Sequence, residues 1–330
     1  MIISRTPHRI SFFGGGTDYP DYYLKHGGKV LGAAIDKYCY ITCRKLPPFF
    51  NHTHRIVYSK VETVNQIDEI QHPSIRETLR YLNIKNGLEI HHDGDIPARS
   101  GMGSSSAFTV GLLKTIYALE GKVISKEEIT REAIYVEQEL IKENVGSQDQ
   151  AFAAHGGFKL IEFSTSGDIS VNPVIIKPDR LKILEKSLLL VFTGISRMAS
   201  VAASDKIKNI PDSTDYLFKM KALVDDAYKV ITSPDKNLNE FGELLNETWK
   251  LKKKLSSEVS TPVIDELYDI VIKNGGIGGK LCGAGGGGFM LFFVEPENRA
   301  TVIASLKDYL YVPFNFDFEG TKIVVYNNHN

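Results

Sequence analysis

The chain has 330 residues, of which 42% are hydrophobic and 24% are charged, and its formal net charge is −1. This length predicts a globular protein of two domains, and the balanced charge gives no broad basic surface for nucleic acid or an anionic membrane. The N-terminal residues lack a signal-peptide pattern, no apolar run is long enough to span a membrane, and the three cysteines show no paired spacing. We therefore expect a reduced, cytoplasmic protein with neither nucleic-acid nor membrane partners.

The first of three glycine clusters follows a predicted strand. Arg9 and Ser11 alternate with apolar residues as in a half-buried strand, which breaks at the run Gly14-Gly15-Gly16-Thr17-Asp18. This run presents the Asp18 carboxylate on backbone that can approach a ligand closely. An Asp that caps the short helix beginning at Pro20 explains the same pattern, and both interpretations stay open.

Strands are predicted next for residues 30–44, 55–61 and 88–92, with a helix over residues 73–82. The second cluster follows the last of these strands and reads Ile96-Pro97-Ala98-Arg99-Ser100-Gly101-Met102-Gly103-Ser104-Ser105-Ser106-Ala107. Apolar residues then recur with helical period, so the three serines are expected at the N-cap and first turn of a helix. Free amides and the helix dipole there favour an anion, and the glycines would let backbone approach a phosphate. A Ser-capped helix after a glycine turn is the alternative, and the lack of a following Lys excludes a Walker loop.

A Ser125–Glu128 capping box predicts a helix that runs to about residue 142. Glu137 lies in the middle of the apolar face of this helix, where a carboxylate is costly unless it pairs with a cation or binds a metal. We favour a divalent-metal ligand over a buried ion pair because the glycine and serine loop is near in sequence. Asp149 is expected at the start of a short helix over residues 149–155, a place where Asp is commonly a cap.

A domain boundary is expected near residue 186, which divides the chain into residues 1–186 and 187–330. Residues 177–179 are expected to form a loop, residues 187–193 a strand, and residues 213–256 and 262–274 helices. The third cluster, residues 278–288, contains the G-x-G-x-x-G pattern of Gly283, Gly285 and Gly288. The dinucleotide fingerprint needs a strand before it and a helix after it, and we expect the reverse order here. A nicotinamide-dependent oxidoreductase is therefore disfavoured.

Taken in this order, the segments resemble the GHMP kinases, a family of small-molecule kinases. The first family motif is similar to residues 7–19, the second, P-x-x-x-G-x-G-S-S-[SA]-A, to residues 97–107, and the third to residues 280–293. The resemblance covers nearly the whole chain. It implies an α+β fold with an N-terminal ribosomal-protein-like α/β domain and a C-terminal ferredoxin-like α+β domain.

The resemblance also implies ATP and Mg²⁺ as cofactors and assigns roles by position. Asp149 would be the catalytic carboxylate, and Arg9 would keep it ionised and stabilise the transferring phosphoryl group. Ser105 and Glu137 would hold Mg²⁺, and Gly285 with its neighbours would support the phosphate loop. The implied ATP-binding residues are Pro97, Ser100, Gly101, Met102, Gly103, Ser104, Ser105 and Ser106.

The Gly-Gly-Gly-Thr-Asp form of the first motif resembles the branch of the family that contains D-glycero-D-manno-heptose 7-phosphate kinases, with bacterial fucokinases close by. Galactokinase-type chains carry Gly-Glu-His-Thr-Asp instead. The resemblance implies phosphorylation of the anomeric hydroxyl to a 1,7-bisphosphate, towards nucleotide-activated heptose for surface glycans. The implied substrate-binding residues are Gly15, Gly16, Thr17, Asp18, Arg197, Gly285 and Gly286.

A phosphorylated acceptor requires basic residues at the far end of its pocket. The candidates are His8, Arg9, Arg99 and, foremost, Arg197. Two other activities remain open: a GHMP kinase for another sugar such as fucose, and a non-catalytic regulator that binds sugar and ATP on the same fold. The resemblance also leaves a homodimer open.

Overall fold

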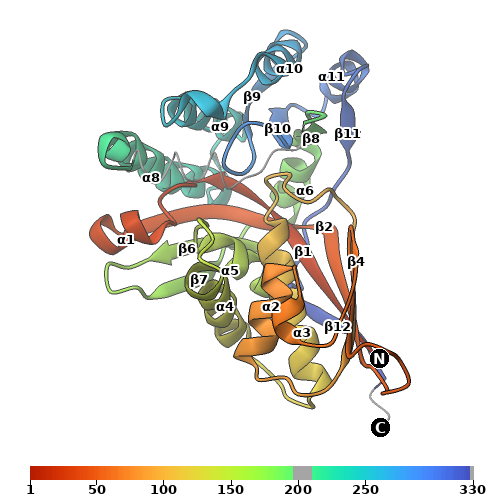
Figure 1. The fold of residues 1–330 in the computed structure, drawn as a ribbon. Helices are drawn as coiled ribbons and strands as arrows, with labels where there is room; N and C mark the ends of the chain where they lie inside the picture. Colours follow the sequence, from red (N-terminus) through yellow and green to blue (C-terminus); the bar gives the residue numbers. More distant parts are fainter. Residues whose placement is uncertain (196–209, 328–330) are drawn as a thin grey trace.

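The computed structural model describes residues 1–195 and 210–327. Within these ranges the strands form two sheets, which lie one above the other in Figure 1. The first has the order β12-β1-β2-β5-β3-β4, with β6 on β2 and β7 on β6, and the second has the order β11-β8-β10-β9. The α+β class is confirmed. In the described part of the chain, every helix is too short or too polar to cross a membrane.

The elements of the first half of the chain are β1 (Ile2–Phe13), α1 (Pro20–His26), β2 (Gly28–Lys45), β3 (His54–Val57), β4 (Val61–Val64), η1 (Ile67–Glu69), α2 (Pro73–Tyr81), β5 (Leu88–Gly94), α3 (Ser104–Leu119), α4 (Lys126–Tyr135), η2 (Val136–Leu140), α5 (Gln148–His155), β6 (Phe158–Phe163) and β7 (Ile169–Pro173). Those that follow are α6 (Pro178–Ser187), β8 (Leu188–Phe192), α8 (Ile210–Thr232), α9 (Asn239–Lys253), η3 (Ser257–Val259), α10 (Pro262–Lys273), β9 (Gly276–Leu281), β10 (Phe289–Val294), α11 (Arg299–Ser305), β11 (Leu310–Val312) and β12 (Lys322–Tyr326).

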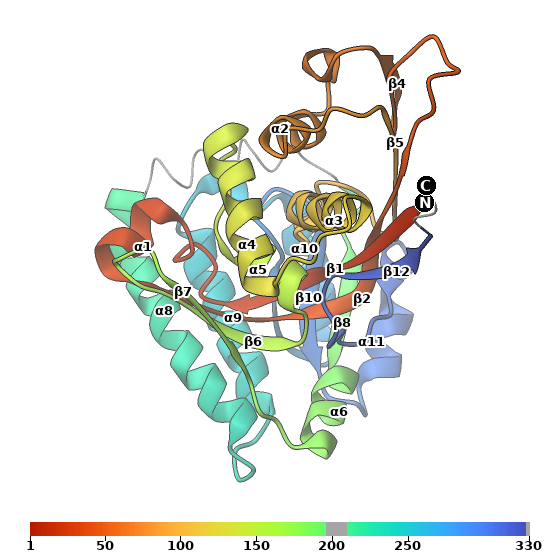
Figure 2. The same ribbon diagram turned by 90° about the horizontal axis from the view of Figure 1, so that it is seen from below.

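Two long antiparallel strands, β1 and β2, form the centre of the molecule. They pair from Ile2 opposite Cys43 to Phe13 opposite Leu31. The N-terminal half of β2 also pairs with β6, and its C-terminal half pairs with β5. Helices α3 and α5 pack on one face of β1, whereas α8 and α9 lie on the other side (Figure 2).

Aromatic side chains at the end of β1 join the first sheet to the second half of the chain. Phe12 stacks on Phe158 of β6 at 5.1 Å and meets Phe241 of α9 edge to face at 5.5 Å. Phe13 contacts the same Phe241 ring at 5.0 Å. These large buried rings contribute strongly to packing. They fix the end of β1, where the first glycine cluster begins, against α9.

Several boundaries differ from the sequence predictions. The strand expected over residues 55–61 is a hairpin of β3 and β4. Residues 177–179, expected as a loop, contain the start of α6, with Pro178 in its first turn, where a missing N–H costs nothing. The capping box of α4 is confirmed, but the α-helix ends at Tyr135 and continues as the π-helical turn η2. Such turns are rare and occur frequently at functional sites.

The context of the third glycine cluster also differs from the prediction. The cluster does not follow a helix directly, because residues Gly276–Leu281 form strand β9, which pairs with β10 as a hairpin. Three of the six residues of β9 are glycines, so local β propensity is weak, and the pairing with the apolar β10 decides the conformation. A strand still follows the cluster, so the dinucleotide fingerprint remains excluded.

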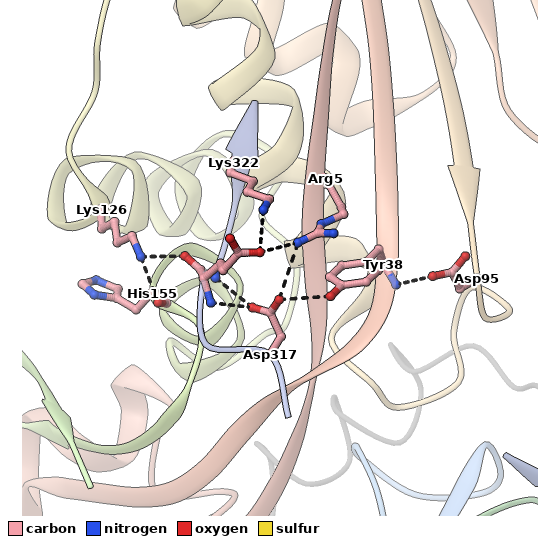
Figure 3. Close-up of polar contacts among 9 residues, drawn as sticks. Arg5, Tyr38, Asp95, Lys126, His155, Asp317 and Lys322 are labelled. Atoms are coloured by element: carbon pink, nitrogen blue, oxygen red, sulfur yellow. Dashed lines mark hydrogen bonds and ion pairs between the residues drawn. The ribbon is translucent and has the colours of Figure 1, made fainter. Parts of the chain in front are cut away.

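The C-terminal segment returns to the first sheet, where β12 pairs with β1. The expected boundary near residue 186 falls at the end of α6, but β12, which the prediction places in the second domain, belongs to the first sheet. Before β12, the buried Asp317 carboxylate accepts hydrogen bonds from the amides of Glu319 and Gly320 and from the Tyr38 hydroxyl (Figure 3). Lys126 donates to the carbonyls of Glu319 and His155, so the turn is held against the end of α5.

Candidate active site

The loop between β5 and α3, called the phosphate loop below after its predicted role, leads through two left-handed glycines into the N-terminus of α3. Gly101 and Gly103 have φ angles of 80° and 72°, in the left-handed region that favours glycine. Gly103 is the N-cap of α3, so the serines occupy the first turn and none is the cap. The Ser104 hydroxyl accepts a hydrogen bond from the Arg99 amide at 3.2 Å. The free amides of this turn and the positive end of the dipole of a 16-residue helix therefore lie at the loop.

The other side chains of this segment divide into two groups. Pro97 and Ser105 are exposed, whereas Met102 and Ser100 are fully buried. The carbonyl of Met102 accepts a hydrogen bond from the Arg9 amide at 3.1 Å, which fastens the loop to β1. Of these four residues, Ser105 alone offers an exposed hydroxyl to a ligand. Its assignment to ATP and Mg²⁺ stays a prediction.

The third glycine cluster packs directly on the phosphate loop, backbone against backbone. A Cβ at Gly101 would lie 2.6 Å from the carbonyl oxygen of Cys282, and one at Gly283 would lie 2.4 Å from the Cα of Gly101. A Cβ at Gly288 would lie 2.1 Å from the carbonyl oxygen of Ser100. Glycine is therefore required on both sides of this contact. The supporting loop is the connection between β9 and β10.

Gly285 and Gly286 lie elsewhere in the same connection. A Cβ at Gly285 would meet the Cα of Val259 at 2.9 Å, and the Gly286 amide donates to the Val259 carbonyl at 3.1 Å. At the base of the connection, the buried Lys252 of α9 donates to the carbonyl of Leu281 at 2.7 Å. The two glycines therefore contact η3, and the residues that touch the phosphate loop are their neighbours. A role for Gly285 and Gly286 in substrate binding stays a prediction.

Arg9 and Asp149 form a bidentate ion pair beside the phosphate loop. The Nε and Nη2 atoms of Arg9 donate to the two carboxylate oxygens at 2.8 and 2.7 Å. Its Nη1 atom donates to the carbonyl of Gly101 at 2.7 Å. A Cβ at Gly103 would lie 3.3 Å from the Asp149 carboxylate, so the loop touches this residue. The Arg9 side chain is 6% exposed and that of Asp149 is 23% exposed, so the carboxylate is the partner that remains open to a ligand.

Charges around this pair affect the pKa values of Arg9 and of the nearby Tyr19. Burial disfavours the charged Arg9, but the charge and hydrogen bonds of Asp149 outweigh it and raise the pKa of Arg9 above its ordinary value. Burial, followed by the charges of Asp18 and Asp149, raises the pKa of the Tyr19 hydroxyl. Tyr19 therefore stays a neutral phenol. The charge of Asp18 also contributes to the raised pKa of Arg9, so Asp18 lies within electrostatic reach of the guanidinium.

The first glycine cluster holds Asp18 in a buried position. Its Oδ1 atom accepts from the Gly16 amide at 2.8 Å, and its Oδ2 atom accepts from Nε2 of Gln148 at 2.8 Å. Asp18 does not cap α1, because the N-cap is Tyr19. The Thr17 hydroxyl donates to the carbonyl of Gly14 at 2.8 Å, so it stabilises the loop itself. The structure thus brings Asp18 next to α5, whereas Thr17 is engaged within its own turn.

Glu137 is fully buried on η2, as its place in the apolar stripe predicted. Its Oε2 atom accepts from Oγ of Ser106 at 2.8 Å and from Nε2 of Gln150 at 2.5 Å. Its Oε1 atom has no hydrogen-bond partner among the described residues. Burial raises the pKa of Glu137 to about 7, against the hydrogen bonds that oppose it. The ion pairs of residues 1–195 and 210–327 include none with Glu137, so a buried ion pair does not explain this carboxylate.

The residues around Glu137 fit a bound Mg²⁺. A buried carboxylate oxygen without a partner is a ready ligand, and Mg²⁺ in nucleotide sites commonly takes one or two carboxylates with phosphate oxygens and waters. The hydroxyl that bonds to Glu137 is that of Ser106, whereas Ser105 is exposed in the same helical turn. In the described ranges no group of three or more His, Cys, Asp or Glu side chains could hold a metal alone. A cation here would need further ligands from the nucleotide.

The basic residues suggested for a substrate phosphate are placed unequally. Arg197 lies outside the described residues. His8 is buried, and desolvation with the charge of Arg9 lowers its pKa to about 4, so it is neutral near pH 7. Arg9 is engaged by Asp149, and Arg99 is exposed on the phosphate loop. None of the three described candidates forms a free, inward-facing cation.

Sequence reasoning missed several residues that build this site. Gln150 bonds to Glu137, Gln148 bonds to Asp18, and the buried Lys280 of β9 donates to the carbonyl of Ser11 at 2.6 Å. The two glutamines flank Asp149 in the sequence, and a polar residue on each side of a candidate catalytic Asp is a usable signal. The partner of Lys280 is 269 residues away and has no local signal.

Two family models match this chain: the GHMP kinases N terminal domain over residues 71–157 and the GHMP kinases C terminal domain over residues 222–312. D-glycero-alpha-D-manno-heptose 7-phosphate kinase of Campylobacter jejuni is 32% identical over 97% of this chain and 98% of its own. L-fucokinase/L-fucose-1-P guanylyltransferase of Bacteroides fragilis is 29% identical over 92% of this chain, which spans 35% of that protein.

The solved structures agree with the sequence matches. A D-glycero-D-manno-heptose 1-phosphate kinase from Bacteroides thetaiotaomicron superimposes with a TM-score of 0.80 at 25% identity, over 98% of both chains. A mevalonate kinase from Methanococcus jannaschii superimposes with a TM-score of 0.72 at 24% identity, which supports the fold alone. The resemblance expected from the three motifs is confirmed, and the chain belongs to the GHMP kinase family.

Proposed function

We propose that the protein is an ATP- and Mg²⁺-dependent kinase that phosphorylates the anomeric hydroxyl of D-glycero-D-manno-heptose 7-phosphate. The product would be the 1,7-bisphosphate, on the route to nucleotide-activated heptose for surface glycans. The membership in a family of kinases and the 32% identity to a heptose 7-phosphate kinase over 97% of the chain support this proposal. The Gly14-Gly15-Gly16-Thr17-Asp18 motif supports the sugar as acceptor.

The Arg9–Asp149 pair at the edge of the phosphate loop is the observation that carries the proposal. In-line phosphoryl transfer needs an acceptor hydroxyl, a γ-phosphate and a carboxylate within contact of one another. Asp149 is partly exposed and lies against Gly103, so a hydroxyl that bonds to Asp149 would also lie beside phosphates held by the loop. Asp149 orients this hydroxyl and accepts its proton as the hydroxyl oxygen bonds to the γ-phosphorus, while the bond from the γ-phosphorus to the bridging oxygen breaks and ADP leaves.

The remaining residues of the site bind and orient. The amides of the first turn of α3 would hold the phosphates of ATP. Mg²⁺ would be held by Glu137 of η2 together with a serine hydroxyl from the first turn of α3. When bound, the cation neutralises the negative charge of the phosphates. Arg9 holds Asp149 in a single orientation through two hydrogen bonds. Most of the rate enhancement would come from positioning and electrostatics.

A second candidate is a fucose kinase, which the 29% identity to the Bacteroides fragilis fucokinase over 92% of this chain supports. It would use the same nucleotide site and the same Asp149, and differ only at the acceptor. A catalytically silent regulator on this fold is a further alternative. A regulator could lose the catalytic residues, whereas this chain keeps Arg9, Ser105, Glu137 and Asp149 together.

The test is ATP consumption with Mg²⁺ over a panel of acceptors: heptose 7-phosphate, free heptoses, fucose, galactose, mannose and mevalonate. Turnover confined to heptose 7-phosphate is the expected result. Turnover of fucose alone would replace the proposed acceptor with the second candidate. Silence over the whole panel while ATP still binds would overturn the proposed activity in favour of the regulator.

A further inference from the structure

Two buried side chains near Gly15 each have a polar atom with no hydrogen-bond partner among the described residues. These atoms are Oγ of Ser11 and Oε1 of Gln148. The two residues are 5% and 6% exposed. Buried polar groups in folded proteins are nearly always satisfied, and an unpaired one calls for an explanation. Gln148 also bonds to Asp18, the carboxylate expected to bind the acceptor, so the two unpaired atoms indicate that a ligand supplies their missing hydrogen bonds.

Gly15 lies between these two side chains and leaves space there. A Cβ at this position would be 3.5 Å from Oγ of Ser11 and 3.9 Å from Nε2 of Gln148. Because glycine has no side chain, this volume is open to an atom of a bound molecule. The Gln148 amide is held in place by the 2.8 Å hydrogen bond from its Nε2 atom to Asp18, so its Oε1 atom is the acceptor that remains.

These groups lie beside the pair that handles the reacting hydroxyl. Alternate residues of a strand share one face, and β1 is regularly paired with β2 from His8 to Ser11, so Arg9 and Ser11 are on the same side. Gln148 directly precedes Asp149 at the start of α5. One strand and one helix end therefore supply both the ion pair and the two unpaired polar atoms.

We infer that Ser11 and Gln148 form a subsite for the sugar hydroxyl vicinal to the one that is phosphorylated. Oε1 of Gln148 accepts a hydrogen bond from this hydroxyl, and Oγ of Ser11 donates one to it. The inference deepens the proposed function and rests on it: the acceptor class is a polyol with vicinal hydroxyls. An acceptor that lacks the second hydroxyl would leave both buried groups unpaired, and a site of this kind rejects it strongly.

The test compares kcat/KM for heptose 7-phosphate with kcat/KM for its 2-deoxy analogue. The variants are Ser11→Ala and Gln148→Met, and the control is Ser170→Ala, an exposed serine on β7. Ser11→Ala removes a hydroxyl that bonds to nothing in the described protein, so it leaves folding undisturbed. The KM for ATP, measured in parallel, reports on the phosphate loop.

We expect the ratio of kcat/KM for heptose 7-phosphate to kcat/KM for its 2-deoxy analogue to fall about tenfold in both variants. The KM for ATP should stay unchanged, and the control variant should keep the wild-type ratio. If the wild-type enzyme phosphorylates the heptose and both variants prefer it over the 2-deoxy analogue as strongly as wild type does, the inference is overturned and the proposed function stands. A wild-type enzyme that phosphorylates neither sugar would overturn the proposed function, and the inference with it.

Discussion

The burial of Glu137 predicts that the stability of the protein depends on pH, and its proposed metal role predicts a dependence on Mg²⁺; one substitution tests both. The Glu137 pKa of about 7 in the folded protein compares with an ordinary value of 4.5. The folded state therefore binds this proton more tightly than the unfolded state. Its stabilising effect is fully present below pH 4.5 and is lost as the pH rises through about 7. The difference between the two pKa values corresponds to about 3 kcal/mol.

Glu137→Gln replaces the carboxyl with a neutral group of the same shape. The Gln oxygen can still accept from Ser106 and Gln150, so the variant resembles the protonated protein at every pH. We expect the free energy of unfolding of the variant, relative to wild type, to rise by about 3 kcal/mol between pH 4.5 and pH 8 without divalent cations. Urea denaturation at several pH values measures this difference. Glu139→Gln, an exposed position on the same helical turn, is the matched control.

Mg²⁺ separates a metal ligand from a carboxyl that is merely buried. Bound to the ionised carboxylate, the cation should stabilise wild type at pH 8 by mass action, and it should not stabilise Glu137→Gln. The Mg²⁺ requirement of turnover should rise in the variant. If the unfolding free energies of Glu137→Gln and wild type differ by the same amount at pH 4.5 and at pH 8, burial does not raise the pKa of Glu137. Equal stabilisation of both proteins by Mg²⁺ would refute the metal assignment.

Three further substitutions test the candidate site and the turn that contains Asp317. Asp149→Asn should lower kcat by at least about 100-fold while the Kd for ATP stays roughly constant, since the carboxylate acts on the acceptor; near-normal turnover would remove it from the mechanism. Asp18→Ala should raise the KM for the sugar about tenfold and leave the KM for ATP unchanged, and an effect on ATP alone would contradict the assignment of the first motif. Asp317→Ala should destabilise the protein by about 3 kcal/mol in urea unfolding, because the buried Gly320 amide and the part-buried Glu319 amide and Tyr38 hydroxyl lose their acceptor. The exposed Asp308→Ala is its control, and equal effects of the two would show that the Asp317 turn is not structural.

The sequence predicted the burial of Glu137 because burial on a helix follows from local periodicity. Its partners could not be predicted in the same way. Ser106 and Gln150 lie 31 and 13 residues from it, on α3 and α5, and helix packing alone brings them together. The prediction therefore identified the buried carboxylate but not its partner Ser106, and the roles of Glu137 and Ser105 in holding Mg²⁺ stay predictions.

The errors in the predicted elements have a common physical origin. The β9 strand contains Gly276, Gly278 and Gly279, which have little strand propensity, and it exists because β10 pairs with it. The β12 strand joins a partner more than 300 residues away in the sequence, which no local pattern reveals. The start of α6 is different, because a Pro at the first turn is a local signal that favours a helix and could have been used.

The glycine clusters explain why so much of the site follows from motifs. Each cluster allows backbone to approach backbone more closely than any side chain permits: a Cβ at Gly14 would lie 1.9 Å from the carbonyl oxygen of Lys29, and one at Gly288 would lie 2.1 Å from that of Ser100. Contacts of this kind fix the loops together with side-chain hydrogen bonds such as those from Arg9 and Thr17 to the carbonyls of Gly101 and Gly14. Arg9 and Asp149 lie against a loop whose backbone the glycines allow to pack closely. A pattern of glycines in the sequence therefore predicts where the backbones of the site loops pack against each other. The choice of acceptor depends, in our inference, on side chains such as Ser11 and Gln148, to which the motifs assign no role.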